Sequence, residues 1–210
     1  MPYAAVLFDL DGTLVDTITL YERAVVQALK KWHVHVSHDR FLRWYKTAVH
    51  LKEMLAKVGL SDVHAPAVRD HRDNLYERLL RTDVEWLPGA KKTLDRLKGK
   101  VPLAIVTGSW LSYVQAIQQK LDVLSYAQAL VTADEIHKFM KPHPHGLLLA
   151  CDRLGVKPED CLYVGDQQFD VDAATAAGMP CWAIQGKWSP AKITSAERVV
   201  QSLEELDGAW

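Results

Sequence analysis

Short apolar runs and helical patterns alternate along most of this chain. Five runs of three to five apolar residues are typical of strands that a sheet buries on both faces. They are Ala4–Phe8, Leu103–Val106, Ala129–Val131, Leu162–Val164 and Cys181–Ile184. Segments with helical spacing lie between or beside the later runs: Pro88–Leu97, Ser109–Leu121, Pro144–Leu154 and Phe169–Ala177. This alternation predicts an α/β fold built on a doubly wound parallel sheet.

About ninety residues separate the first run from the second, far more than a simple crossover connection needs. Most of this stretch has helical spacing, and none of it has a strand pattern. The helices expected there are Leu20–Trp32, Arg40–Ala48, Leu51–Val58 and Ala67–Arg81. We therefore predict an α/β core domain of residues 1–15 and 87–210 and an inserted helical cap domain of residues 16–86.

Charge and composition narrow the possible partners. The 210 residues carry a net charge of −1, so the charge favours neither nucleic acid nor an anionic membrane. No stretch reaches the roughly 18 apolar residues of a membrane span, and the N-terminus lacks a signal-peptide pattern. Cys151, Cys161 and Cys181 lie in apolar surroundings, which favours buried free thiols over a disulfide or a catalytic thiol. We expect a cytoplasmic protein, either a monomer or a homodimer.

Polar side chains gather where the predicted strands end. Asp9 and Asp11 follow the first strand, and their spacing of two directs both side chains to the same side. The later strands are followed by hydroxyls, a glycine, a lysine and two more acids: Thr107, Gly108 and Ser109; Lys141; and Asp166 and Asp170. In an open parallel α/β sheet, ligands bind beyond the carboxyl ends of the strands. The sequence therefore predicts one site at this edge.

The types of residue at this edge favour a metal and a phosphate group. Several carboxylates around one point repel one another unless a hard cation compensates them, and oxygen ligands favour Mg²⁺. No cysteine or histidine set has zinc spacing. Thr107 and the N–H groups of Gly108 and Ser109 are expected to cradle phosphate where Ser109 caps a helix, and Lys141 neutralises charge. The combination favours phosphoryl transfer, with one carboxylate attacking phosphorus and another handling protons.

Four motifs in this order carry a family resemblance: FDLDGT, VTGS, KP and VGDQQFD. With the insert after the first motif, they resemble the haloacid dehalogenase superfamily of phosphohydrolases over nearly the whole chain. The insert resembles the helical cap of the phosphoglycolate phosphatase and β-phosphoglucomutase branch. The resemblance implies a Rossmann-like core. The acid at Asp11 implies a phosphatase, because the dehalogenases that name the family lack an acid there.

The resemblance also implies roles for the matching residues. Asp9 resembles the nucleophile that takes the phosphoryl group, and Asp11 resembles the general acid that then becomes the base. Thr107 and Lys141 resemble the phosphate binders. Mg²⁺ in such enzymes is held by residues that correspond here to the Asp9 carboxylate, the Asp11 backbone carbonyl and Asp166.

Two positions near the last motif qualify this picture. Asp170 resembles a supporting acid that orients the site through water or Lys141, rather than a direct metal ligand. Gln167, followed by Gln168, stands where a small serine or threonine is usual after the first acid. This departure concerns the surroundings of the metal rather than the metal itself.

The cap is expected to decide which substrate binds. Arg43, Lys46 and His50 lie at three- and seven-residue spacings on one predicted helix and can reach a carboxylate or a sugar hydroxyl. The alternative is a solvated helix face. Trp44 and Tyr45 either line the closed pocket or pack the cap.

The prediction is a Mg²⁺-dependent phosphatase that hydrolyses a small phosphate monoester through an aspartyl-phosphate. Phosphoglycolate or a sugar phosphate is the substrate that the resemblance implies. One alternative is a phosphomutase of the β-phosphoglucomutase type, which returns the phosphoryl group to a second hydroxyl. Another is a non-catalytic phosphate-binding or regulatory protein on the same scaffold. The only expected partner is the small-molecule substrate.

Overall fold

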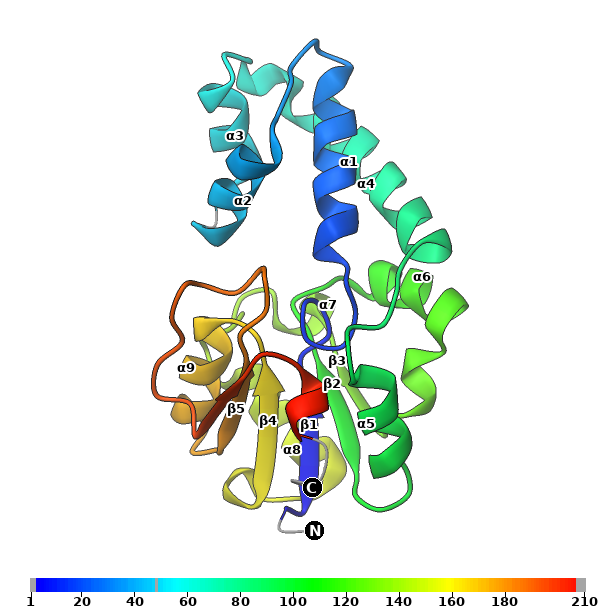
Figure 1. The fold of residues 1–210 in the computed structure, drawn as a ribbon, viewed down its shortest axis with the longest axis vertical. Coiled ribbons are helices and arrows are strands. Elements are labelled where there is room, and N and C mark those ends of the chain that lie inside the picture. The colour runs from blue at the N-terminus through cyan, green and yellow to red at the C-terminus, as the bar shows by residue number, and fades with distance from the viewer. Residues whose placement is uncertain (1–2, 48, 207–210) are drawn as a thin grey trace.

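The five apolar runs form neighbouring strands of one parallel sheet in the computed structural model, which describes residues 3–47 and 49–206 (Figure 1). The strands lie in the order β3-β2-β1-β4-β5-β6, and every neighbouring pair is parallel. Their bounds are β1 Ala5–Phe8, β2 Leu103–Val106, β3 Ala129–Val131, β4 Cys161–Gly165, β5 Cys181–Ile184 and β6 Arg198–Val200. The predicted doubly wound α/β fold is confirmed.

The strand β6 has no counterpart in the sequence prediction. It has three residues at the edge of the sheet, where Arg198 pairs in register with Trp182 of β5. Arg198 and Val199 are exposed and Val200 is buried. A short edge strand with one buried side chain produces no apolar run, so periodicity does not detect it.

Helices cover both faces of the sheet. Val6 and Phe8 of β1 pack on one face with α5 and α6, and Ala5 and Leu7 pack on the other face with α7, α8 and α9. The alternation of side chains along a strand explains why successive residues serve opposite faces. The bounds are α5 Ala90–Leu97, α6 Leu111–Leu121, α7 Ala133–Ile136, α8 His145–Leu154 and α9 Gln168–Ala176, with the 3-10 helices η2 Val123–Ser125, η3 Pro158–Asp160 and η4 Leu203–Leu206.

Between β1 and α5 the chain forms a group of helices beyond the carboxyl ends of the strands, which we call the cap (Figure 1). Its elements are α1 Ile18–Lys30, α2 His38–Lys46, α3 Leu51–Lys57, the 3-10 helix η1 Asp62–His64 and α4 Ala65–Thr82. These helices agree with the four predicted ones to within a few residues. The predicted end of the second one, Ala48, lies outside the described residues.

The apolar cluster of the cap includes one side chain from the core. Trp188, in the connection between β5 and β6, is 4% exposed and packs with residues of the cap helices. Its ring centroid lies 6.3 Å from that of Phe41 and 6.0 Å from that of Tyr45, both on α2. The connection after β5 therefore takes part in cap packing.

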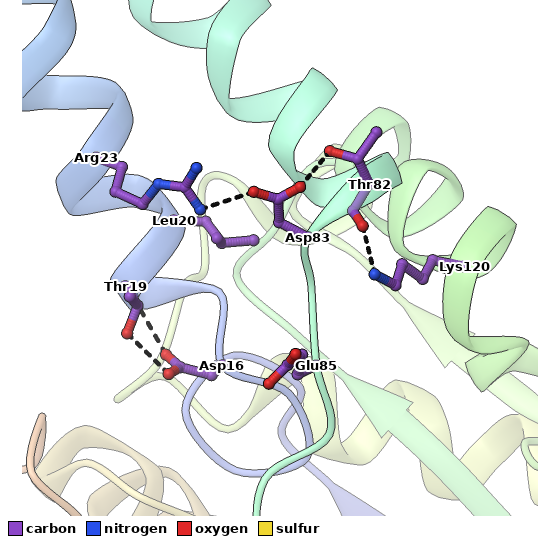
Figure 2. Close-up of a pocket in the computed structure, with 8 residues that line it drawn as sticks. All are labelled: Asp16, Thr19, Leu20, Arg23, Thr82, Asp83, Glu85 and Lys120. Carbon is purple, nitrogen blue, oxygen red and sulfur yellow. Dashed lines mark hydrogen bonds and ion pairs between the residues drawn. The ribbon is translucent and has the colours of Figure 1, made fainter.

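Two antiparallel segments, residues 14–16 and 85–87, connect the cap to the core. Backbone hydrogen bonds of 3.0 and 2.9 Å link these two segments to each other. Beside them, Arg23 of α1 forms an ion pair of 2.8 Å with Asp83, and Lys120 of α6 donates to a carbonyl at the end of α4 (Figure 2). These contacts tie both connecting segments to each other and to the core.

All three cysteines are buried, as the sequence predicts, and they are free thiols; the nearest two sulfur atoms, those of Cys151 and Cys161, are 3.9 Å apart. Within the part of the chain that the structure describes, no helix combines the length and the apolar character needed to cross a membrane.

Candidate active site

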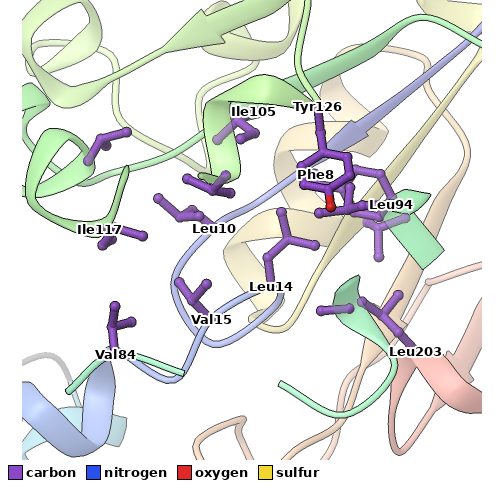
Figure 3. Packing of buried hydrophobic residues seen from close by; sticks show 14 of the residues in the cluster. Phe8, Leu10, Leu14, Val15, Val84, Leu94, Ile105, Ile117, Tyr126 and Leu203 are labelled. Atoms are coloured by element: carbon purple, nitrogen blue, oxygen red, sulfur yellow. The ribbon is translucent and has the colours of Figure 1, made fainter. Parts of the chain in front are cut away.

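The two acids of the first motif are separated by a buried leucine. Leu10 is fully buried in the apolar cluster of the core, together with Leu14 and Val15 of the segment leading to the cap (Figure 3). Asp9 and Asp11 line a cavity at the carboxyl edge of the sheet instead. The apolar anchor thus fixes the chain between the two carboxylates and directs both of them to the same cavity.

Two threonine hydroxyls hold Asp11. Thr17 donates to its Oδ1 at 2.7 Å, and Thr107 donates to its Oδ2 at 2.8 Å. The Oγ1 atom of Thr107 also accepts the N–H of Ser109 at 3.0 Å. In this arrangement the hydroxyl of Thr107 faces Asp11, so its expected role in binding phosphate stays a prediction.

The start of α6 differs from the sequence prediction. The N-cap residue is Trp110, and the helix begins at Leu111, so the assignment of Ser109 as the cap is wrong. The reason is that the Ser109 N–H bonds to Thr107 and its carbonyl accepts the N–H of Ala133, which keeps this residue out of the helix. Gly108 lies two residues before the cap and lines the cavity.

Lys141 is buried at the centre of the site, with 5% of its side chain exposed. Its Nζ donates to Asp9 Oδ1 at 2.7 Å, to Asp170 Oδ1 at 2.5 Å and to the hydroxyl of Tyr163 at 2.8 Å. Burial lowers the pKa of Lys141, but the charges of Asp170 and Asp9 outweigh burial and raise the pKa above its ordinary value. The lysine therefore carries a positive charge between the two acids.

Asp170 is fully buried, and both of its oxygens are occupied. Its Oδ2 accepts the N–H groups of Asp166 and Gln167 at 3.1 and 2.9 Å, while Oδ1 accepts from Lys141 and from Tyr163. The structure thus places Asp170 against Lys141, where a supporting acid is expected. Tyr163 was missed by sequence reasoning, because a tyrosine inside a buried strand is indistinguishable from an ordinary core residue.

Asp166 is 1% exposed, and its Oδ2 atom accepts hydrogen bonds from neighbours on two connections. The Gln167 Nε2 donates to Asp166 Oδ2 at 2.5 Å and lies 3.4 Å from the carbonyl oxygen of Trp188. Ser189 adds a longer contact to the same Oδ2 atom at 3.5 Å. The glutamine in place of a small residue therefore bridges Asp166 and the connection that packs on the cap.

The carboxylates outnumber the positive charges at this centre. Burial raises the pKa of Asp9; Lys141 lowers it and Asp170 and Asp11 raise it, with a result of about 7. Burial and then the charge of Asp170 raise the pKa of Asp166 well above its ordinary value. Two buried acids with raised pKa values indicate a centre that needs more positive charge than one lysine supplies.

The donor atoms fit a hard cation. Carboxylate oxygens of Asp9, Asp166 and Asp170 lie within 4.8 Å of one another. Because Asp170 is saturated, the free capacity is on Asp9 Oδ2 and Asp166 Oδ1. Among residues 3–47 and 49–206, each of these two atoms has only a 3.4 Å contact, from the Thr13 hydroxyl. Oxygen donors of this kind suit Mg²⁺, whose charge would compensate the two acids.

A cavity of about 800 Å³ opens above these residues, between the core and the cap. Among the candidates expected in the cap, Tyr45 and His50 line it, whereas Arg43 and Lys46 do not. Trp44 is buried in the cap cluster. Helix α2 therefore faces the cavity with Tyr45 and not with the basic residues Arg43 and Lys46.

Helix α4 contributes two arginines that sequence reasoning missed, Arg69 and Arg72, three residues apart. Arg72 is paired with Asp73, with its Nε 2.7 Å from the Asp73 Oδ1 atom, and it donates to the Tyr21 hydroxyl at 3.0 Å. Their spacing on one helix face was the available signal. The spacing alone does not indicate that this face of α4 lines the cavity.

The parallel sheet, the buried carboxylates at its carboxyl edge and the helices of the cap define the class of fold and site. The family model described as haloacid dehalogenase-like hydrolase matches residues 6–184, and the chain belongs to that family. The family inferred from the four motifs is confirmed.

Curated relatives specify the class of enzyme. The chain is 32% identical over 183 residues to the phosphoglycolate phosphatase of Photorhabdus laumondii, covering 84% of this chain and 78% of the relative. It is 29% identical over 181 residues to the fructose-1-phosphate phosphatase YqaB of Escherichia coli K12, covering 84% and 94%. These relatives bear out the predicted class of enzyme, a phosphatase of this family.

Solved structures share the fold. CbbY from Rhodobacter sphaeroides in complex with phosphate matches with a TM-score of 0.82 at 22% identity, covering 97% of this chain and 96% of CbbY. A predicted phosphoglycolate phosphatase from Haemophilus somnus matches with a TM-score of 0.85 at 22% identity, covering 100% and 99%. The whole chain, cap included, therefore has the architecture of these proteins.

Proposed function

We propose that this protein is a Mg²⁺-dependent phosphatase that cleaves a small phosphate monoester through a phosphorylated Asp9. The observation that carries the proposal is the environment of Asp9 at the floor of the cavity. One of its oxygens is held by Lys141 at 2.7 Å, while the other has, within the described part of the chain, only a 3.4 Å contact with Thr13. A carboxylate that is fixed on one side and free on the other is suited to attack an incoming phosphorus atom.

In this proposal Asp11 handles the protons. Hydroxyls of Thr17 and Thr107 fix its carboxyl group beside Asp9, and it faces the same cavity. In the first half-reaction an Asp9 oxygen bonds to phosphorus, the ester P–O bond breaks, and Asp11 protonates the leaving alcohol. In the second, Asp11 takes a proton from water, whose oxygen bonds to phosphorus and releases Asp9 and inorganic phosphate.

Charge compensation is shared between Lys141 and a cation. Lys141 keeps its proton and offsets negative charge near Asp9 and the phosphoryl group. Mg²⁺ would be held by the carboxylates of Asp9 and Asp166 and the backbone carbonyl of Asp11, and it would supply further positive charge to the phosphoryl oxygens. In this proposal Asp170 positions Lys141, and Gly108, which lines the same cavity, binds phosphate through its amide.

The relatives suggest the first esters to test. Their names specify phosphoglycolate and fructose 1-phosphate, so these two compounds and other sugar phosphates are the starting substrates of the proposal. A cytoplasmic location belongs to the same proposal, since small phosphate esters of metabolism are found there.

The test is phosphate release from a panel of monoesters with Mg²⁺ and with a chelator. We expect turnover that requires Mg²⁺ and disappears in Asp9→Asn, while the exposed control Asp152→Asn keeps it. Mass spectrometry of the quenched reaction should find a phosphoryl group on the peptide that contains Asp9. Product analysis with sugar phosphates separates hydrolysis from transfer to a second hydroxyl. Failure to release phosphate from any ester, or full activity in Asp9→Asn, contradicts the proposal.

A further inference from the structure

The core side of the cavity has an apolar rim, which consists of Trp110, Met140 and Phe169. These side chains are 47%, 39% and 43% exposed, respectively, and all three line the same cavity as Asp9. Large apolar side chains that remain exposed together beside a polar centre mark a binding surface for an apolar group.

The apolar rim begins directly at the phosphate end of the cavity. The Phe169 ring lies over Lys141, with its centroid 5.6 Å from Nζ. On another side, the terminal methyl group of Met140 would be 3.1 Å from a Cβ atom added at Gly108. Trp110 follows Gly108 by two residues as the N-cap of α6. A phosphoryl group beside Asp9 would therefore hold the rest of its ester against the rim.

Aromatic side chains also line other parts of the cavity. Tyr21 and Tyr76 of the cap and Tyr113 of the core line it, and the rings of Tyr76 and Tyr113 pack edge to face with centroids 5.0 Å apart. Arg72 lies over the Tyr21 ring, but its charge is compensated by Asp73. These tyrosines add aromatic surface to the cavity, and the arginine beside Tyr21 is ion-paired.

We propose that the preferred substrates are phosphate monoesters of alcohols that carry a planar, mostly apolar ring, such as an aromatic or heteroaromatic group. This inference rests on the phosphatase function proposed above and concerns only the part of the substrate beyond the phosphate. A ring of this kind covers the apolar rim, whereas a glycolate carboxylate is too short and too polar to do so. The remaining basic side chains, Arg69 and His50, are exposed, and exposed ion pairs add little affinity.

A matched pair of substrates tests the inference. Ethyl phosphate and 2-phenylethyl phosphate both release a primary alcohol and differ by the ring alone. We expect kcat/KM to be about tenfold or more higher for the phenylethyl ester, because stacking on aromatic side chains contributes at this level. Phosphoglycolate should lie below it.

Variants assign the preference to the rim. Trp110→Ala should reduce the ratio of the two kcat/KM values several-fold, mainly through KM for the phenylethyl ester. Leu148→Ala removes an apolar side chain of similar exposure, 40%, that lies outside the cavity, and it should leave the ratio unchanged. Equal kcat/KM values for the matched pair, or a phosphoglycolate value well above both, overturn the inference.

Binding measurements keep the inference separate from the proposed activity. Calorimetry with 2-phenylethylphosphonate and ethylphosphonate should show the same preference for the ring, even if no ester is hydrolysed. Equal binding of the two phosphonates overturns the inference regardless of turnover.

Sedimentation of the wild type and of Trp110→Ala tests whether a second copy of the chain binds the apolar rim instead of a ligand. A dimer that this substitution abolishes would assign the rim to a second copy of the chain and also overturn the inference.

Discussion

Replacing Lys141 by methionine removes the charge at the centre of the site and keeps most of the apolar stem. In the wild type the lysine lies 2.7 Å from Asp9 and 2.5 Å from Asp170, both buried. Removing one partner of a buried ion pair costs about 3–5 kcal/mol, because the other partner is left in an apolar environment without compensation. We therefore expect Lys141→Met to lower the free energy of unfolding by about 4 kcal/mol at pH 8 without Mg²⁺.

The pH dependence of this loss follows from Asp9. Its pKa in the folded protein is about 7, above the value of about 4 in an unfolded chain, and Lys141 lowers it. Without the lysine the pKa rises further. A carboxyl group whose pKa is raised by folding binds a proton more tightly in the folded state, so stability increases as the pH falls below the folded pKa. Between pH 8 and pH 6 the variant should recover about 1 kcal/mol more than the wild type.

Urea unfolding followed by circular dichroism, with chelator at pH 8 and pH 6, measures both effects. Lys138→Met is the control, because Lys138 is an exposed lysine on the same connection and its loss should cost little. A loss below about 1 kcal/mol for Lys141→Met, or a loss that is equal at both pH values, would refute the reasoning from buried charge.

Three further outcomes are expected. Gly165→Ala should destabilise the protein by about 1–3 kcal/mol and reduce turnover, since a Cβ atom there would lie 2.5 Å from the Asp170 Cβ. Urea unfolding measures the loss, and Gly186→Ala, with open space around the glycine, is the control. Gln167→Leu should weaken Mg²⁺ binding about tenfold, because it removes a hydrogen bond to Asp166, a predicted metal ligand. The Mg²⁺ concentration that gives half of the rise in melting temperature measures this affinity. An unchanged concentration would argue against a role of Gln167 in positioning Asp166. Removing Mg²⁺ with a chelator should lower the melting temperature of the wild type and have no effect on Asp166→Asn, so an equal shift in both would place the ion elsewhere.

The central sheet could be predicted from sequence because its strands are buried on both faces. All residues of β1, β2 and β5 are buried, so each appears as a continuous apolar run. The edge strand β6 and the short helix α7 escaped, since three or four residues with partial exposure do not establish a period. The start of α6 was misplaced because the hydrogen bonds of Ser109 depend on a distant neighbour, Ala133.

The proximity of the acids and the lysine could be predicted for a related reason. Parallel strands bring their carboxyl ends to one edge, so Asp9 and Lys141 could be placed together from their order alone. Trp188 and Arg69 could not, because their proximity to the site depends on how the cap and the last connection pack in three dimensions. Tyr163 could not, because a tyrosine inside a buried strand has the pattern of an ordinary core residue. A pattern along one element shows which face is polar, but it does not show what that face meets.

The burial of Trp188 among cap side chains has a consequence for engineering. A chimaera that takes residues 16–86 from a relative would set this indole against foreign side chains, because its neighbours Phe41 and Tyr45 would leave with the graft. The transplantable unit is therefore discontinuous in sequence: the donor's loop between β5 and β6 must travel with its helices.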